Sequence, residues 1–498
     1  MNGERALDAL REAFGSRAVL EDPAGLSPYA GAEFPAPEGE PVCAVKPGGA
    51  GDVVELVRLA RREGMNLVPV SSSPPHRKGG SRPRGRGVMV DLTAMRGIVR
   101  MDRRNRVALV EPGVTFPQLR EAASRQGLRV LAPLAPRPGK SALAACLERE
   151  PFLIPKYHWD TTDPLLCMEV VFGTADVFRT GSAAGPGGLE DQWECSNFQK
   201  NPMGPASSDL GKLVQGSQGT LGLVTWGSIK LELEPALRRC YLAEAGEPGP
   251  LLELARGACR RRLGDEMLLL DRLALACLLE REPRERQGEA GGEGRPAYAL
   301  IYILSGIEGY LPGKRVALQE RAMAELAREA GLSRPRLLEG GEEKRLLGEL
   351  EGGEGTWWKH RLRGGCQELF FLTTMDRAPR LISMLREAAG RRGFAAGEPA
   401  VYLQPLLQGR ACHLELLYFH DPSDGEERKR AREAAREAAG LAAGQGAFLS
   451  RPHPPWEDTA YSRCPDSVSA LRRLKRVFDP DGVLNRGRLC FADNGGGA

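Results

Sequence analysis

Short apolar runs and one-sided helical patterns alternate between residue 38 and about residue 135. Asp52 can cap a helix whose apolar residues recur on one side, and TFPQLREAASRQG predicts a second helix that ends at Gly127. The apolar runs predict strands at Val42–Val45, Leu67–Val70, Val88–Leu92 and Val107–Val110. This part of the chain is therefore expected to alternate strand and helix.

The pattern changes further along the chain. Residues 136–205 are rich in proline, glycine and aromatic residues, and only LLCMEVVFG and ADVFRTG predict strands there. So much irregular chain often marks a binding surface. Residues 207–235 then predict a helix (SSDLGKLVQ), a glycine turn (GSQGTLG) and a strand (LVTWGSIKLELEP).

A strand–helix unit recurs after residue 236. ALIYILSG, ELFFLTTM and HLELLYF predict strands, and a long helical segment follows each of them. This repetition predicts an antiparallel sheet that carries helices on one face. The last forty residues or so, from about SRPHPPWED, predict a separate tail of helix and turn.

Composition and charge restrict the class of protein. The 498 residues are 42% hydrophobic and 27% charged, and the net charge of +4 is too small to indicate nucleic-acid binding. The 11 cysteines form no CxxC pair, which argues against a zinc site, an iron–sulfur cluster or a disulfide framework. The N-terminal pattern lacks an apolar signal region, and no apolar run approaches the length of about 18 residues that a spanning helix needs. We therefore expect a cytoplasmic protein without direct membrane insertion.

One stretch, NLVPVSSSPPHRKGGSRPRGRGVMVDL, joins two predicted strands through a serine–proline turn and a basic loop. A strand, a turn of small residues and several cations suit a phosphate, although glycine is the usual residue of such a turn. Serine offers backbone and hydroxyl donors, whereas Pro74 and Pro75 offer no N–H. Two interpretations are open: a variant phosphate cradle at Ser71–Ser73, or a turn whose ligand binding has weakened.

Four stretches occur in the order found in one flavoprotein superfamily. They are PVCAVKPGGAGDVVELVRLARREG, VMVDLTAMRGIVRMDRRNRVALVEPGVTFPQLREAASRQGL, LVQGSQGTLGLVTWGSIKLEL and LRRLKRVFDPDGVLNRGRL. Together they resemble the flavin-linked oxidases and dehydrogenases of the vanillyl-alcohol oxidase / p-cresol methylhydroxylase (PCMH) superfamily, which includes glycolate oxidase and D-lactate dehydrogenase branches. The resemblance covers roughly residues 38–235 and 465–490.

The resemblance implies an α+β fold, with a two-lobed FAD-binding domain of the PCMH type and an antiparallel-sheet cap domain bearing helices on one face. FAD would lie between the lobes, with the cap over its ring. The expected boundaries are 1–37 for an N-terminal helical segment, 38–235 for the FAD-binding domain, 236–450 for the cap or substrate domain, and 451–498 for a C-terminal segment returning to the FAD domain.

The same resemblance implies FAD as cofactor and places its pyrophosphate on the turn after Leu67–Val70. The glycine turn of residues 216–222 keeps the superfamily pattern more closely. Ser141 stands where the superfamily has Thr or Ser followed by two glycines, but Ala142 and Leu143 follow here. The cofactor-binding residues that we predict are Ser71, Ser72, Ser73, Ser141, Gly216, Ser217, Gly219, Thr220, Gly222, Val224 and Asn485.

The resemblance also implies candidate catalytic residues. In the hydroxy-acid branches, two histidines of a GHxGDGNxH-like strand and a later Glu-His-Gly look like the metal and base site. Here QPLLQGRACHLELLYF keeps His413 but has Leu406 at the earlier histidine, and GAFLSRPHPP replaces the later element. We therefore expect no metal. His413 is either a base or substrate contact over the flavin, or a packed core histidine.

Two further stretches contain candidates for the substrate site. In TrpTrpLysHisArg, Lys359 or Arg361 would pair with a substrate carboxylate, or both would be solvated at a helix end. Tyr157 lies among aromatic residues of the irregular central segment, where it would flank the flavin ring.

These expectations describe an FAD-linked dehydrogenase or oxidase that dehydrogenates a small hydroxylated substrate, a 2-hydroxy acid, phenol or alcohol, by hydride transfer to flavin. Electrons would pass to a partner redox protein or subunit, because the sequence shows no cluster, haem or nicotinamide motif. The alternative enzyme is an oxidase, in which oxygen reoxidises the flavin directly. A flavin-binding or flavin-free scaffold subunit of a larger redox complex is the alternative from another class. We expect no nucleic-acid partner, and the oligomeric state stays open.

Overall fold

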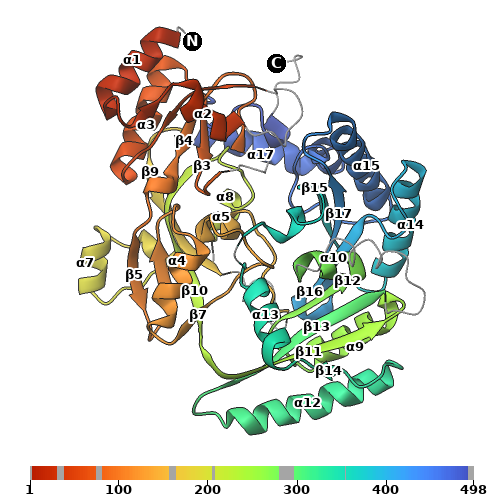
Figure 1. The fold of residues 1–498 in the computed structure, drawn as a ribbon. Helices are drawn as coiled ribbons and strands as arrows, with labels where there is room; N and C mark the ends of the chain where they lie inside the picture. Colours follow the sequence, from red (N-terminus) through yellow and green to blue (C-terminus); the bar gives the residue numbers. More distant parts are fainter. Residues whose placement is uncertain are drawn as a thin grey trace.

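The computed structural model describes residues 3–30, 39–74, 81–155, 164–204, 208–279, 297–353 and 355–491. The molecule has two halves (Figure 1). Residues before about 234 form a two-lobed half with two sheets, drawn in red to yellow. The green-to-blue half is built around one seven-stranded sheet, and we call it the cap.

The first lobe is a four-stranded sheet. Its strand order is β1 (Val19–Leu20), β2 (Pro41–Val45), β4 (Gly87–Asp91) and β3 (Leu67–Val70). The last three run parallel, because α3 (Ala50–Glu63) carries the chain from β2 across to β3. Helix α1 (Gly3–Phe14) buries Leu10 in the same core as Leu56 of α3. The N-terminal segment therefore packs into this lobe.

The second lobe is an antiparallel sheet built around one long strand. Its strands are β5 (Ile98–Asp102), β6 (Val107–Val110), β7 (Leu128–Val130), β8 (Leu165–Val171), β9 (Val177–Arg179) and β10 (Leu223–Leu233). Strand β10 pairs with β6, β7 and β8. Helices α4 (Phe116–Ser124) and α5 (Ala142–Leu147) bury Phe116 and Leu143 against this sheet. The predicted strands of both lobes are present, and β5 is one that the apolar pattern did not reveal.

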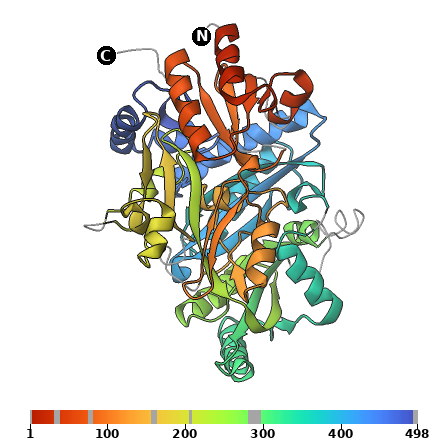
Figure 2. The same cartoon turned by 90° about the vertical axis from the view of Figure 1, so that its left-hand side faces the viewer.

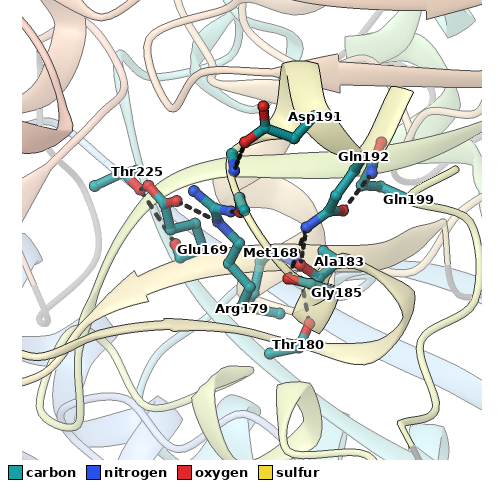
Figure 3. A network of polar contacts seen from close by, with 12 residues as sticks. Met168, Glu169, Arg179, Thr180, Ala183, Gly185, Asp191, Gln192, Gln199 and Thr225 are labelled. Atoms are coloured by element: carbon teal, nitrogen blue, oxygen red, sulfur yellow. Dashed lines mark hydrogen bonds and ion pairs between the residues drawn. The ribbon is translucent and has the colours of Figure 1, made fainter. Parts of the chain in front are cut away.

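A polar network anchors part of the irregular central segment (Figure 3). Glu169 of β8 accepts hydrogen bonds from Arg179 Nε and Thr225 Oγ1, both at 2.8 Å. Gln192 of α7 (Leu189–Glu194) donates from Nε2 to the carbonyl oxygens of Ala183 and Gly185. These side chains satisfy one another inside the protein, so residues 181–199 form a packed layer rather than an open binding surface.

The cap contains a seven-stranded antiparallel sheet. Its strand order is β14 (Arg336–Leu337), β11 (Pro235–Ala245), β13 (Tyr298–Ile307), β12 (Met267–Asp271), β16 (Ala400–Leu406), β17 (Ala411–His420) and β15 (Gly365–Thr373). Four long helices bury their apolar sides in one core with this sheet: α9 (Pro248–Arg260), α12 (Pro312–Glu329), α14 (Ala378–Arg391) and α15 (Gly425–Gly444). This arrangement confirms the predicted α+β fold, with the four long helices on one face of the sheet.

The opposite face of the cap sheet is turned toward the two-lobed half. Its core includes shorter helices, α10 (Arg272–Leu278) and α13 (Gly340–Leu350), together with Leu134 and Leu153 of the second lobe. Helix α17 (Pro465–Phe478) and the residues after it return to the two-lobed half, beside β3, as Figures 1 and 2 show. Among the described helices, none is both long and apolar enough to cross a membrane.

Candidate active site

Two adjoining cavities lie where the two-lobed half meets the cap. The larger has a volume of about 190 Å³, and we call it the cap cavity because side chains of the cap sheet line it. The smaller has a volume of about 130 Å³, and we call it the turn cavity because the glycine turn lines it. The residues that line both are Pro69, Ser71, Ala144, Glu148, Gln218, Arg451 and His453.

The glycine turn forms one wall of the turn cavity. Gly216 has φ +76°, and a Cβ at this position would meet nothing within 4 Å, so the backbone leaves open space there. Gly219 has φ +72°, and a Cβ there would lie 2.3 Å from the ring of Pro69 in β3. Both positions need glycine, the first for its backbone conformation and the second also for close packing.

The C-terminal tail holds this turn against β3. Buried Asp479 accepts hydrogen bonds from two backbone N–H groups of the tail and pairs with Lys475. Lys475 Nζ also donates to the carbonyl oxygen of Thr220 at 2.6 Å. Asn485 donates from Nδ2 to the carbonyl oxygen of Gln218 at 2.7 Å, and from its backbone to a β3 carbonyl. The Asp-Pro-…-Asn ending thus positions the glycine turn.

The serine turn is partly occupied by bonds within the protein. Ser73 donates its N–H to Gly139 O at 2.9 Å, and Ser72 Oγ accepts from the N–H of Ser141 at 3.1 Å. Ser71 lines both cavities and Ser72 lines the cap cavity. The Ser73 N–H is therefore already satisfied, and Ser71 and Ser72 are the residues of this turn that face the cavities.

Ser141 begins helix α5. Its Oγ donates to Pro112 O at 2.5 Å and accepts from the N–H of Ala144 at 3.0 Å, so the side chain caps the helix. Ser141 lines neither cavity, in keeping with a role in joining the serine turn to α5.

Three charged residues near the end of α5 form what we call the turn-side cluster: Lys140, Glu148 and Glu150. Lys140 Nζ lies 2.8 Å from Glu148 Oε2 and 3.0 Å from Glu150 Oε1. Burial raises the pKa of Glu148, and the like charge of Glu150 adds to this, against the opposing effect of Lys140. All three residues line the cap cavity.

A second triad, the cap cluster, lines the same cavity from the other side: Lys359, Glu368 and Glu415. Lys359 Nζ donates to both carboxylates. Burial alone would lower the pKa of Lys359, but the two carboxylates outweigh it and raise that pKa. His413 Nε2 lies 3.2 Å from Glu415 Oε2, and burial lowers the pKa of His413. The imidazole is therefore neutral near pH 7 and donates to Glu415.

The segment GAFLSRPHPP supplies two more cavity residues. The Arg451 guanidinium lies 3.9 Å from the centroid of the Phe370 ring, and Arg451 makes no ion pair with any residue that the structure describes. His453 is buried, and its Nδ1 lies 3.4 Å from Gln218 Nε2. Arg451 and His453 both line the two cavities, so this segment brings a cation to their junction.

The predicted catalytic residues separate in space. Lys359 is in the cavity wall, whereas His413 lies one layer behind it, in contact with Glu415. Arg361 lines neither cavity, because it pairs with Glu349 at 2.9 Å and donates to a carbonyl of α10. Tyr157 lies outside the described residues.

The predicted cofactor-binding residues of the glycine turn mostly face the turn cavity. The residues of this set that line it are Gly216, Ser217, Gly219, Gly222 and Val224. Thr220 and Asn485 are fully buried and hold the turn from behind. Some of the predicted turn residues therefore line the cavity, and the others hold the turn in place from behind.

Sequence reasoning missed most of the charged cavity residues: Glu148, Glu150, Glu368, Glu415, Arg451 and His453. One signal was available, because strand alternation places Glu415 on the same face of β17 as His413. Another was the tail segment itself, which looked only like the loss of a metal-binding element. Within the described ranges, no three His, Cys, Asp or Glu side chains gather closely enough to hold a metal ion.

Two family models match the parts of the chain that build these walls. The FAD binding domain model matches residues 41–141, which include the serine turn, and the FAD linked oxidases C-terminal domain model matches residues 408–489, which include Arg451 and the tail. The chain is an FAD-linked oxidoreductase. Its glycine turn fits this cofactor, since Gly216 leaves open space toward the turn cavity. When bound, FAD supplies the oxidant for hydride transfer.

Similar proteins confirm the superfamily of this FAD-linked oxidoreductase. An uncharacterized FAD-linked oxidoreductase of Mycobacterium tuberculosis is 24% identical over 481 residues, 93% of each chain. The 4-cresol dehydrogenase [hydroxylating] flavoprotein subunit of Pseudomonas putida is 27% identical over 203 residues, 40% of this chain and 38% of the relative. A crystal structure of p-cresol methylhydroxylase with substrate bound shares the fold, with a TM-score of 0.84, 19% identity and coverage of 100% and 99%.

Proposed function

We propose that this FAD-linked oxidoreductase dehydrogenates a small hydroxylated substrate in the cap cavity, with hydride transfer to FAD bound along the turn cavity. The observation that carries the proposal is the junction of the two cavities, where a cofactor on one side meets a substrate on the other. The cap cavity, at about 190 Å³, suits a small molecule rather than a polymer.

Unsatisfied donors in the cap cavity favour a substrate with an anionic oxygen. Arg451 offers a guanidinium at the cavity junction. Trp358 is 1% exposed, and its Nε1 has no hydrogen-bond partner among the described residues. A carboxylate of a 2-hydroxy acid or the oxygen of a phenol would satisfy both donors. The aromatic side chains Phe370 and Tyr402 complete a wall that suits a flat or apolar substrate body.

The predicted catalytic residues acquire different proposed roles. Lys359 orients Glu368 and Glu415 at the cavity wall, and His413 acts on the cavity through Glu415 rather than directly. The proposed FAD contacts are the backbone of Ser71 and Ser72 and the glycine turn from Gly216 to Gly222.

Electrons are proposed to leave through a partner redox protein. The name of the Pseudomonas putida relative, a flavoprotein subunit, supports such a partner. Direct reoxidation by oxygen is the alternative, and anaerobic reduction followed by addition of oxygen or of a one-electron acceptor separates the two. Fast reoxidation by oxygen alone would contradict the need for a partner.

Flavin reduction by a substrate panel tests the proposed function. The FAD-loaded protein is mixed anaerobically with 2-hydroxy acids, 4-alkylphenols and neutral alcohols, and bleaching of the flavin absorbance is followed. We expect bleaching by an anionic class, and an Arg451→Met variant should raise KM for that class far more than for a neutral alcohol. Arg463→Met is the control, because Arg463 is exposed on the tail surface. A protein that retains FAD but is bleached by no hydroxylated compound would contradict the proposal, and one that retains no FAD would favour the scaffold.

A further inference from the structure

One carboxyl group occupies the junction between the cofactor and substrate spaces. The cap cavity is lined by four glutamates, whereas the turn cavity is lined by Glu148 alone among the acidic residues described. The Glu148 side chain is 27% exposed, so a ligand in either cavity can reach it. Of all the described carboxyl groups in these walls, Glu148 is thus the one placed to meet both a substrate hydroxyl and the cofactor.

The surroundings of Glu148 make its carboxylate a good proton acceptor. Glu148 is the C-cap residue of α5, where the partial negative charge of the helix end opposes a second negative charge. Glu150 shares the same ammonium group of Lys140 and adds another like charge. Each of these features raises the affinity of Glu148 for a proton, which suits a general base working near neutral pH.

Glu415, the competing carboxylate, is less available. Its Oε1 accepts from Lys359 and its Oε2 from His413, so both oxygens already have donors. Glu415 also lines the cap cavity only. Both oxygens of Glu415 are thus engaged in holding Lys359 and His413, so this carboxylate is placed to orient its neighbours rather than to reach a substrate hydroxyl.

We propose that Glu148 is the catalytic base of this oxidoreductase, an inference that rests on the proposed function. The substrate C–H bond breaks with its electron pair and its hydrogen passes as hydride to the flavin. The O–H bond of the same carbon breaks, its electron pair forms the C=O bond, and its proton passes to a carboxylate oxygen of Glu148. Lys140 holds that carboxylate in place and compensates Glu150 while the proton is absent.

Other charges face Glu148 and affect its titration. They are Arg137, Lys140 and Glu150 from its own half, Arg451 and His453 from the tail, and the cap cluster across the cavity. The two clusters each carry two carboxylates and one ammonium, so the arginines offset their excess negative charge. A substrate anion bound at Arg451 would remove part of that compensation and strengthen the affinity of Glu148 for the proton that it must take.

The test compares Glu148→Gln with Glu150→Gln in the FAD-loaded protein. The rate of anaerobic flavin reduction is measured over about four pH units above the ordinary glutamate pKa of about 4.3. In the wild type the rate should rise with pH as Glu148 loses its proton and then level off. Glu148→Gln should retain FAD and reduce it about 10²–10⁴-fold more slowly, without that pH dependence. Glu150→Gln should reach a similar plateau at lower pH, because a like charge has been removed.

A second measurement does not depend on turnover. Infrared spectroscopy of the protein should show the carbonyl stretch of a protonated carboxyl that disappears with rising pH, and this titration should be absent in Glu148→Gln but present in Glu190→Gln, an exposed residue of α7. If Glu148→Gln binds FAD poorly, Glu148→Asp keeps the carboxyl and should keep the titration.

The outcomes separate the two proposals. Wild-type reduction by a hydroxylated substrate, together with unchanged rate and pH profile in Glu148→Gln, would overturn the role of Glu148 and leave the proposed function standing. Failure of every hydroxylated substrate with the FAD-loaded wild type would overturn both. A slow Glu148→Gln variant that keeps the wild-type pH profile would assign the base to another group.

Discussion

The two walls of the cap cavity carry the same charges in different settings. Each has one lysine between two glutamates, but the turn-side cluster comes from an 11-residue stretch, Lys140 to Glu150, and the cap cluster from three segments brought together by the sheet. In the cap cluster a neutral histidine adds another donor to one carboxylate. In the turn-side cluster, Glu148 is instead the C-cap residue of α5. The two clusters therefore differ not in the number of charges but in the hydrogen-bond donors that surround each carboxylate.

This contrast suggests a division of labour. A carboxylate whose oxygens are all occupied keeps its charge and holds its shape, which suits orientation of a substrate. A carboxylate opposed by a helix dipole and a like charge exchanges its proton more readily. With FAD in the turn cavity, as proposed, the exchangeable proton belongs to Glu148, the carboxyl group that lines that cavity as well as the cap cavity.

The largest effect is expected from a substitution that disrupts the glycine turn and leaves the cap unchanged. Gly219→Val should abolish FAD retention, because the side chain would collide with Pro69 and the positive φ is unfavourable for a branched residue. The collision displaces the turn from β3, so the cofactor space is lost indirectly. Flavin absorbance per protein after purification measures this effect.

Gly331→Val is the matched control for that variant. Gly331 also has a positive φ, +71°, but a Cβ there meets nothing within 4 Å, and it lies in the cap after α12. The backbone strain at this position should lower the free energy of unfolding by about 1–2 kcal/mol, and the variant should keep its flavin. Equal flavin loss in both variants would mean that general destabilisation, not the turn, governs retention.

A smaller effect is expected from breaking the cap cluster. Lys359→Met leaves Glu368 and Glu415 buried without their ammonium, which should lower the free energy of unfolding by about 3–5 kcal/mol. Lys344→Met, at an exposed position of α13, should change it by no more than about 0.5 kcal/mol. Chemical denaturation of both variants checks this. Flavin content should survive in Lys359→Met, since the turn wall is unchanged, and its loss would show that the two walls depend on one another.

The sequence pattern identified the elements that repeat or alternate clearly. The apolar runs predicted most strands of the two lobes, but not β1, β5 or β7, which are short or partly polar. The three strand–helix units of the cap, β13–α12, β15–α14 and β17–α15, were predictable because each apolar run is followed by a charged helix. Strand β12 and helix α10 adjoin without a loop in MLLLDRLALACLL, where Asp271 ends the strand and caps the helix by accepting from the N–H of Ala274. Strand β16 contains Pro405, which weakens its strand pattern.

The site was less predictable because its chemistry arises from contacts between distant segments. The glycine turn was recognisable as a motif, whereas the cap cluster joins residues that lie as much as 56 positions apart in the sequence. His413 was found because it matches a histidine of the hydroxy-acid branches, but its depth behind Glu415 depends on how the cap sheet faces the other half. Arg361 looked equally available, and only the structure shows that Glu349 satisfies it.

The smallest expected effect concerns His413, and it separates a supporting histidine from a base. His413→Gln keeps a donor for Glu415, so flavin reduction should slow by much less than the factor of about 10² that marks the loss of a general base. The stability of His413→Gln should also depend on pH differently from that of the wild type. Burial lowers the pKa of His413 in the folded protein, so its contribution to stability is complete above the unfolded pKa of about 6.5 and is lost as pH falls through the folded value.

The variant should therefore lose less of its melting temperature than the wild type between about pH 7.5 and about pH 5.5, which bracket the ordinary histidine pKa of about 6.5. His420→Gln is the control, because burial also lowers the pKa of His420, at the far end of the same strand and outside both cavities. Both variants should show the reduced acid sensitivity, but only His413→Gln should affect flavin reduction, since only His413 contacts Glu415. If His413→Gln instead slowed flavin reduction by the factor of about 10² or more expected for loss of a general base, the proton acceptor would belong to the cap cluster and not to the turn-side cluster.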